Sequence, residues 1–112
     1  MAETVLIVDD HAGFRRFARR LLEAGGLTVI GEAEDGATGL AAAQRLDPDV
    51  VLLDVKLPDR DGFEIAGDIA QAVVLTSSHE LDDLRARLER SAARGFIPKH
   101  DLTADALKRL AP

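Results

Sequence analysis

Three aspartates stand directly at the ends of apolar runs. Asp9 and Asp10 follow the run VLIV near the N-terminus, and Asp54 closes the run VVLLD in the middle of the chain. Adjacent carboxylates repel each other, and partial burial at the end of a core strand raises that cost, so a cation is expected beside them. The sequence contains no cysteine, and three carboxylates without a histidine pair favour a hard cation held through oxygen. Mg²⁺, which takes a few carboxylates, water and a phosphate oxygen, fits this donor set.

Hydroxyl and ammonium groups follow two later apolar runs. Thr76 and Ser77 lie in VVLTSS, and Lys99 follows GFIP. A hydroxyl can hydrogen-bond a phosphoryl oxygen, and an ammonium group can neutralise its charge. Together with a Mg²⁺ site, these groups indicate phosphoryl transfer, in which catalysis consists mainly of in-line positioning and charge neutralisation. A carboxylate can itself be the covalent acceptor and form an acyl phosphate.

Short apolar runs alternate five times with stretches of helical spacing. Strands are expected at 5–8, 27–33, 50–54, 73–76 and 95–98. Helices are expected from Phe14 to the sequence EAGG, at 36–46, at 63–70, within 80–94 and within 101–110. Repeated strand–helix units predict an α/β fold with a mostly parallel sheet, flanking helices and right-handed crossovers.

The carboxyl ends of parallel strands form one edge of the sheet, and ligands of open α/β sheets bind there. The candidate residues all follow strand ends: Asp9, Asp10, Asp54, Thr76 and Lys99. In the flavodoxin-like strand order 2-1-3-4-5, the first and third strands are neighbours beside the point where the order reverses. We therefore expect a five-stranded parallel sheet of this order, with the three carboxylates in one pocket.

Length and composition restrict the class of protein. A chain of 112 residues with 46% hydrophobic and 30% charged residues suits one globular domain. No apolar run approaches the roughly 18 to 20 residues of a membrane span, and the N-terminus lacks the pattern of a signal peptide. We therefore expect a cytoplasmic protein that does not bind membranes. The net charge of −6 disfavours direct nucleic-acid binding, which needs a basic face.

The ordered set of motifs resembles the receiver domains of two-component response regulators. LIVDDHAGFRRFARRLLEAGGLTVIGEAEDG is similar to the opening of the subgroup often fused to helix-turn-helix output domains. PDVVLLDVKLPDRDGFE is similar to the phosphoacceptor segment, and VVLTSS and ARGFIPK to the two later motifs. The similarity covers about residues 4–110. It implies a single receiver domain over 1–112, with no output domain in this chain.

The resemblance implies a role for each residue around the acceptor. Asp54 would take a phosphoryl group from the phosphohistidine of a sensor histidine kinase. Asp10 and Asp54 would bind Mg²⁺, or Mn²⁺ in its place, directly, and Asp9 would act through a metal-bound water. Lys56 would add its backbone carbonyl. Lys99 would pair with the phosphoryl group or, before it arrives, with the Asp54 carboxylate.

The resemblance also implies a switch. Thr76 would move toward the phosphoryl group on activation, and Phe96, in the position of the family's switch aromatic residue, would turn inward. The stretch from Thr76 to Lys99 is one residue longer than the family pattern, so Ser77 is the alternative for the hydroxyl role. The surface of the fourth helix, fifth strand and fifth helix would then change and bind an output domain or a target protein. Homodimerisation on phosphorylation is also open.

Three further features depart from the family pattern. His100 rather than proline follows Lys99, the third helix is shortened, and Lys56 places a cation two residues after the acceptor. We expect Lys56 to change the lifetime of the phosphorylated form.

Other charged residues have simpler interpretations. We expect His11 to flank the first helix rather than to act as a base, and His79 and His100 to lie in loops. The first helix carries a stripe of four arginines, Arg15, Arg16, Arg19 and Arg20. This stripe either guides a kinase partner or forms a solvated helical face.

Three other classes of protein compete with the receiver hypothesis. A phosphatase of the haloacid dehalogenase type would need a second aspartate two residues after the first, where this chain has Lys56, and a cap region. A flavodoxin would need a phosphate-binding loop after the first strand, but DDHAGF repels an anionic phosphate in the absence of a metal. A receiver-like interaction module that is never phosphorylated stays open as the alternative.

Overall fold

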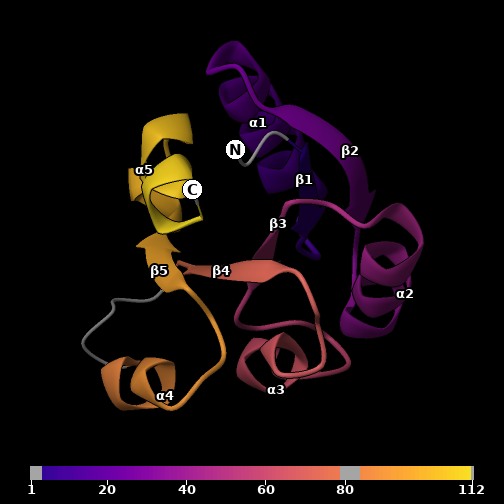
Figure 1. Cartoon of the computed structure of the whole chain (residues 1–112), viewed down its shortest axis with the longest axis vertical. Coiled ribbons are helices and arrows are strands. Elements are labelled where there is room, and N and C mark those ends of the chain that lie inside the picture. Colours follow the sequence, from indigo (N-terminus) through magenta and orange to yellow (C-terminus); the bar gives the residue numbers. More distant parts are fainter. Residues whose placement is uncertain (1–3, 79–83, 112) are drawn as a thin grey trace.

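Five parallel strands form the centre of the structure, a computed structural model that describes residues 4–78 and 84–111 (Figure 1). The strands are β1 (Thr4–Val8), β2 (Thr28–Ala33), β3 (Val50–Asp54), β4 (Ala72–Ser77) and β5 (Gly95–Pro98). Their order, β2-β1-β3-β4-β5, and the parallel pairing of all neighbours confirm the predicted topology. β1 and β3 are therefore adjacent at the point where the strand order reverses.

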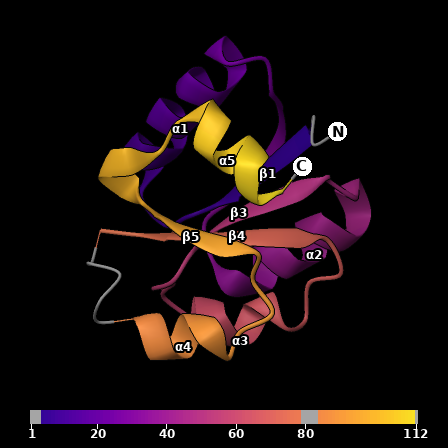
Figure 2. The same ribbon diagram turned by 60° about the vertical axis from the view of Figure 1, so that its left-hand side comes forward.

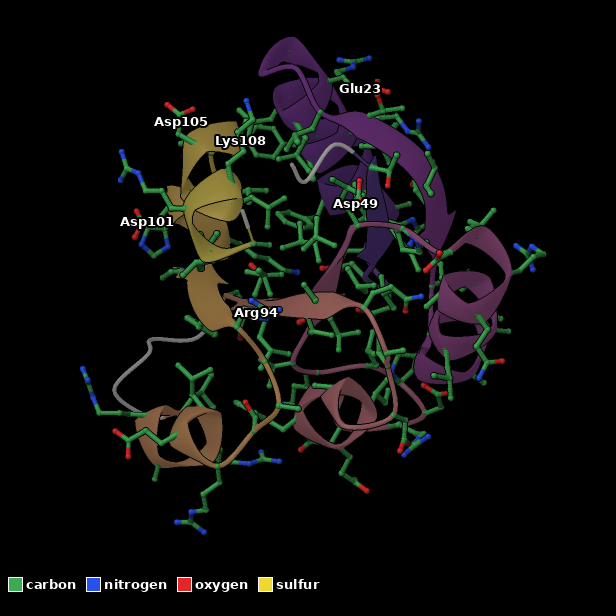
Figure 3. The ribbon with its side chains drawn as sticks, in the orientation of Figure 1. Glu23, Asp49, Arg94, Asp101, Asp105 and Lys108 are labelled. Carbon is green, nitrogen blue, oxygen red and sulfur yellow. The ribbon has the colours of Figure 1, made fainter. Side chains whose placement is uncertain are left out.

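Helices cover both faces of the sheet (Figure 2). They are α1 (Ala12–Ala24), α2 (Gly36–Leu46), α3 (Gly62–Ala66), α4 (Arg85–Glu89) and α5 (Ala104–Leu110), with a 3-10 turn at Lys99–Asp101. α1 and α5 lie on one face, and α2, α3 and α4 lie on the other. Lys108 of α5, labelled in Figure 3, lies beside the end of α1. Its ammonium donates a hydrogen bond of 2.7 Å to the carbonyl of Gly25, the residue after this helix. Within the described ranges, no helix combines the length and the apolar character that crossing a bilayer requires.

Strand alternation divides the core between the two faces of the sheet. In β1, Val8 packs into the cluster beside α2 and α3, whereas Ile7 packs into the cluster beside α1 and α5. β3 is buried along its whole length, as expected for the central strand of a parallel sheet. By the same alternation, Asp9 and Asp54 at the strand ends face the side of the sheet that α1 and α5 cover.

α3 ends earlier than the sequence predicts. The pattern indicates a helix at 63–70, and the structure has Gly62–Ala66. Gly67 follows, and glycine is among the residues that weaken a helix most. Ile69 is then buried in the cluster beside α2 and α3, so the chain turns toward β4 instead of continuing the helix.

α4 occupies part of the stretch predicted as helical. It runs over Arg85–Glu89, inside the predicted range 80–94. Residues 79–83, among them His79, lie outside the described residues. Leu88 packs on the cluster beside α2 and α3, so the described part of α4 shares their face of the sheet.

Gly62 permits a close approach between two backbone segments. Its N–H donates to the Val55 carbonyl at 2.7 Å. A Cβ atom at this position would overlap the carbonyl oxygen of Asp54 and lie 2.8 Å from the Cα atom of Val55. The glycine therefore holds the loop between β3 and α3 against the end of β3, the strand that carries Asp54.

We predict that Gly62→Ala lowers the free energy of unfolding by about 1 to 3 kcal/mol, because backbone atoms must shift to admit the methyl group. Gly13→Ala in α1 is the matched control, since a Cβ there meets nothing within 4 Å. The control should be neutral or stabilising by up to about 1 kcal/mol, the helix-propensity gain of alanine over glycine. Urea denaturation measures both variants. Equal stability of Gly62→Ala and the wild type would contradict the close approach.

Candidate functional site

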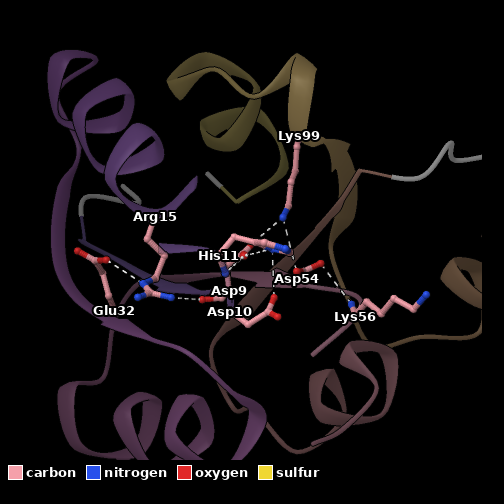
Figure 4. Close-up of polar contacts among 8 residues, drawn as sticks. All are labelled: Asp9, Asp10, His11, Arg15, Glu32, Asp54, Lys56 and Lys99. Atoms are coloured by element: carbon pink, nitrogen blue, oxygen red, sulfur yellow. Dashed lines mark hydrogen bonds and ion pairs between the residues drawn. The ribbon is translucent and has the colours of Figure 1, made fainter. Parts of the chain in front are cut away.

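Three charged side chains meet at the carboxyl edge of the sheet (Figure 4). Lys99, which follows β5, places its Nζ atom 2.8 Å from Asp9 Oδ2 and 3.6 Å from Asp54 Oδ2. The side chain of Lys99 is 16% exposed, and those of Asp9 and Asp54 are 1% and 5% exposed. The structure thus brings together, out of water, three of the residues that the sequence singles out.

Asp10 and His11 complete a group of potential metal ligands. Carboxylate oxygens of Asp9, Asp10 and Asp54 and a ring nitrogen of His11 all lie within 4.8 Å of one another. His11 Nδ1 is 3.2 Å from one oxygen of each adjacent aspartate. Asp9 Oδ2 is buried and receives no hydrogen bond from the described residues, although the Lys99 ammonium lies beside it. A set of three carboxylates with a buried, incompletely satisfied oxygen fits a hard divalent cation.

Burial raises the pKa of Asp54 from 3.8 to about 6. The carboxylate of Asp9 raises this pKa as well, and that of Asp10 adds to the effect. The Lys99 ammonium and the backbone N–H of Lys56, which donates to Asp54 Oδ1 at 3.2 Å, act in the opposite direction. The ionised form of Asp54 is therefore destabilised when no metal is bound, and a bound cation would favour it.

Thr76 and Ser77 project to opposite faces of β4. Thr76 pairs with Asp54 in the sheet register, but its buried hydroxyl donates to the carbonyl of Ile97 at 2.7 Å. Ser77, in contrast, lines a cavity of about 220 Å³ together with Asp54 and Lys99. Of the two candidate hydroxyl residues, Ser77 is the one that lines this cavity.

Phe96 lies on the same face of the sheet as Ser77. It pairs in register with Leu75, two residues before Ser77, and strand alternation gives residues two apart the same face. Phe96 is half-buried and packs on the cluster beside α2 and α3. The predicted switch aromatic residue is therefore on the α4 side of the sheet.

Arg15 of α1 binds the backbone of the loop that follows β1 and carries Asp9 and Asp10 (Figure 4). Its guanidinium donates to the backbone carbonyl of Asp9 and, at 3.1 Å, to Glu32 of β2. Arg19 donates to the other carboxylate oxygen of Glu32 at 2.8 Å. Two arginines of the α1 stripe thus bind within the fold, while the other two are exposed. The sequence pattern shows the stripe, but it gives no signal that identifies Glu32 as the partner.

Two aspartates hold the loop between β3 and α3. Asp59 accepts hydrogen bonds from the N–H groups of Gly36 at 2.7 Å and Ala37 at 3.0 Å, at the start of α2. These bonds lower the pKa of Asp59. Asp61 caps the first turn of α3 and forms an ion pair with Arg87 of α4. Sequence analysis missed both contacts, because their partners lie in distant parts of the chain.

His11, His100 and Lys56, which the sequence singles out, are all exposed. His11 is the N-cap residue of α1, as expected for a histidine that flanks this helix. His100 is exposed in the 3-10 turn after β5. The side chain of Lys56 is exposed and lines the cavity that contains Asp54.

A five-stranded parallel sheet with clustered carboxylates and a lysine at its carboxyl edge has the architecture of a receiver domain. Residues 5–111 match the family model of the response regulator receiver domain. The chain therefore belongs to the response regulator receiver domain family, the phosphorylation-dependent signalling domains of two-component systems.

Individual relatives agree with this assignment. The nitrate/nitrite response regulator protein NarL of Escherichia coli K12 is 34% identical over 114 residues, covering 96% of this chain and 52% of NarL. A protein-glutamate methylesterase/protein-glutamine glutaminase of Anaeromyxobacter dehalogenans is 46% identical over 94 residues, covering 79% of this chain and 27% of that protein. The signal receiver domain of a NarL response regulator from Mycobacterium tuberculosis has a TM-score of 0.87 at 33% identity, covering 97% of this chain and 95% of the other. The chain spans about half of the NarL relative and about a quarter of the methylesterase.

We predict that Asp54→Asn raises the free energy of unfolding of the metal-free protein at pH 7.5 by about 1 to 3 kcal/mol. This range follows from the raised pKa of Asp54, since each pKa unit corresponds to about 1.4 kcal/mol. Because the pKa of Asp54 is raised to about 6 in the folded state, ionisation costs stability as the pH rises from about 4 through 6. The gain should therefore disappear near pH 4, where the folded protein holds Asp54 neutral. Denaturation in EDTA at both pH values measures it.

Asp105→Asn, at an exposed position of α5, is the control and should change stability little at either pH. A gain for Asp54→Asn of the same size at pH 4 and pH 7.5 would contradict the electrostatic explanation.

Proposed function

We propose that Asp54 accepts a phosphoryl group from the phosphohistidine of a sensor histidine kinase, and that phosphorylation switches the signalling surface of this domain. The main support is the position of the Asp54 carboxylate. It lies at the end of the central strand and lines the cavity, while Asp9 and Lys99 face it from the ends of two other strands. The family membership of the chain agrees with this function.

The acidic group would hold the metal that the reaction requires. We assign Asp10, Asp54 and the backbone carbonyl of Lys56 as direct ligands of Mg²⁺, with Mn²⁺ as a substitute. Asp9 would act through a metal-bound water. Hard oxygen donors and the absence of sulfur support this choice. When bound, Mg²⁺ supplies charge neutralisation for the phosphoryl oxygens.

The residues of the chain itself position the transfer. A carboxylate oxygen of Asp54 attacks phosphorus while the bond from phosphorus to the donor nitrogen breaks, which leaves an acyl phosphate on Asp54. Lys99 Nζ, 3.6 Å from Asp54 Oδ2, is close enough to neutralise the incoming charge. The backbone N–H of Lys56 orients the carboxylate. We assign the hydroxyl role to Ser77, the alternative to Thr76, because Ser77 lines the cavity together with Asp54 and Lys99.

Ser77 and Phe96 then connect the site to the surface formed by α4, β5 and α5. A hydrogen bond between Ser77 and the phosphoryl group would give the phosphorylated state a contact that the unphosphorylated state lacks. Such a differential contact is what biases a two-state switch. Phe96, on the same face of the sheet as Ser77, would move together with Ser77. We expect Lys56, exposed at the cavity, to change the lifetime of the acyl phosphate.

We expect the surface of α4, β5 and α5 to transmit the signal by binding another domain or protein. The matched segment covers 52% of NarL and 27% of the methylesterase, and we expect an output domain or a separate target protein as the partner. Phosphorylation-dependent homodimerisation through the same surface is a further expectation. We place the domain in the cytoplasm, and we assign it no direct nucleic-acid contact because its net charge is −6.

We predict that a small acyl phosphate plus Mg²⁺ labels the wild type with one phosphoryl group, as detected by intact-mass spectrometry. Asp54→Asn should abolish the label, and EDTA should prevent it. Asp101→Asn is the matched control, since this aspartate is exposed and is not one of the clustered potential ligands, and it should be labelled like the wild type. Labelling that survives Asp54→Asn would exclude Asp54 as the acceptor. A wild type that is never labelled would favour the unphosphorylated interaction module.

A further inference from the structure

An aromatic ring lies against the ammonium group of Lys99. The Nζ atom is 4.5 Å from the centroid of the Phe14 ring. Phe14 belongs to the first turn of α1 and packs, half-buried, on the core cluster beside α1 and α5. The ring therefore contacts Lys99 from the helix that follows the acidic loop.

The ammonium group has two carboxylates and one neutral ring as neighbours. Asp9 lies at 2.8 Å and Asp54 at 3.6 Å, and the neutral ring of Phe14 lies on a further side. A cation over an aromatic face is attracted by the ring quadrupole, and the attraction grows when water is excluded. Lys99, at 16% exposed, is largely out of water.

We propose that Phe14 is a positioning residue for phosphoryl transfer, which holds the Lys99 ammonium at the site through a cation–π contact. This inference rests on the proposed function of Asp54 and Lys99. The ring supplies attraction without adding a negative charge. Lys99 is thus held near Asp54 and is still able to pair with the phosphoryl group.

The chemistry of the ring distinguishes it from other side chains at this position. A carboxylate would retain Lys99 by a strong ion pair and compete with the incoming phosphoryl oxygens. An aliphatic side chain would fill the space but would add no electrostatic attraction for the ammonium beyond that of Asp9 and Asp54. A neutral aromatic face attracts the ammonium and does not compete with the phosphoryl oxygens for it.

The neighbouring ring of Phe17 provides a matched control. It lies 6.4 Å from the Phe14 ring, centroid to centroid, on the same helix, and is 54% exposed. Lys99 contacts Phe14 and has no described contact with Phe17. Phe17→Leu removes a similar amount of aromatic surface from α1 and leaves the Phe14–Lys99 contact in place.

The test measures the labelling rate of Asp54 with a small acyl phosphate at saturating Mg²⁺. Phe14→Leu should lower the rate about three- to tenfold, the range of a partly desolvated cation–π contact. Phe14→Tyr should restore it, and Phe17→Leu should leave it unchanged. In the Lys99→Met background, Phe14→Leu should cause no further decrease, because coupled residues show non-additive effects. An equal decrease in both backgrounds, or none in either, would overturn the proposal.

A second measurement does not depend on labelling. The chain has three lysines, Lys56, Lys99 and Lys108, so their ε-methylene NMR resonances can be assigned by substitution. The Lys99 resonance should be shifted by the ring current in the wild type and in Phe17→Leu, and should lose this shift in Phe14→Leu. An unchanged resonance would overturn the contact. If the wild type is never labelled at Asp54, the proposed function fails and the positioning role fails with it, whatever the NMR result.

Discussion

Buried carboxylates at one sheet edge repel each other, and Lys99 offsets this repulsion between Asp9 and Asp54. Parallel strand topology makes the conflict unavoidable, because adjacent β1 and β3 both end at this edge. Burial, and after it the Asp9 carboxylate, raise the pKa of Asp54 despite the opposing effect of Lys99, so the lysine compensates only in part. The site thus retains electrostatic repulsion that a divalent cation can relieve. This partial compensation connects ligand binding to the stability of the fold.

The rest of the structure holds the charged loops in place despite the repulsion. Arg15 fixes the Asp9 carbonyl, and Asp59 fixes the β3–α3 loop to the start of α2. Gly62 lets that loop approach the backbone of Asp54. Each contact acts on backbone atoms beside the site and leaves the carboxylate oxygens of the acidic group available. The scaffold is therefore arranged to position charges rather than to neutralise them.

Local sequence pattern predicted most of the fold. The bounds of β3, β5 and α2 agree with the prediction because continuous apolar runs and turn residues define them. The order of polar residues after the strands also placed Asp9, Asp54 and Lys99 at one edge. The hydroxyl was harder to assign, because adjacent residues of a strand face opposite sides and one residue of register decides between them. The contacts of Phe14 and Asp59 could not be predicted, since they join segments far apart in the chain.

The central claim is that Mg²⁺ relieves the repulsion among these carboxylates, and a titration of stability against Mg²⁺ tests it most directly. The free energy of unfolding of the wild type should rise with Mg²⁺ as expected for a ligand that binds only the folded state. NaCl at matched ionic strength should not reproduce the rise, and Asp10→Asn, at an exposed position, should weaken it strongly. A wild type whose stability is indifferent to Mg²⁺, or an Asp10→Asn protein that responds like the wild type, would contradict the account.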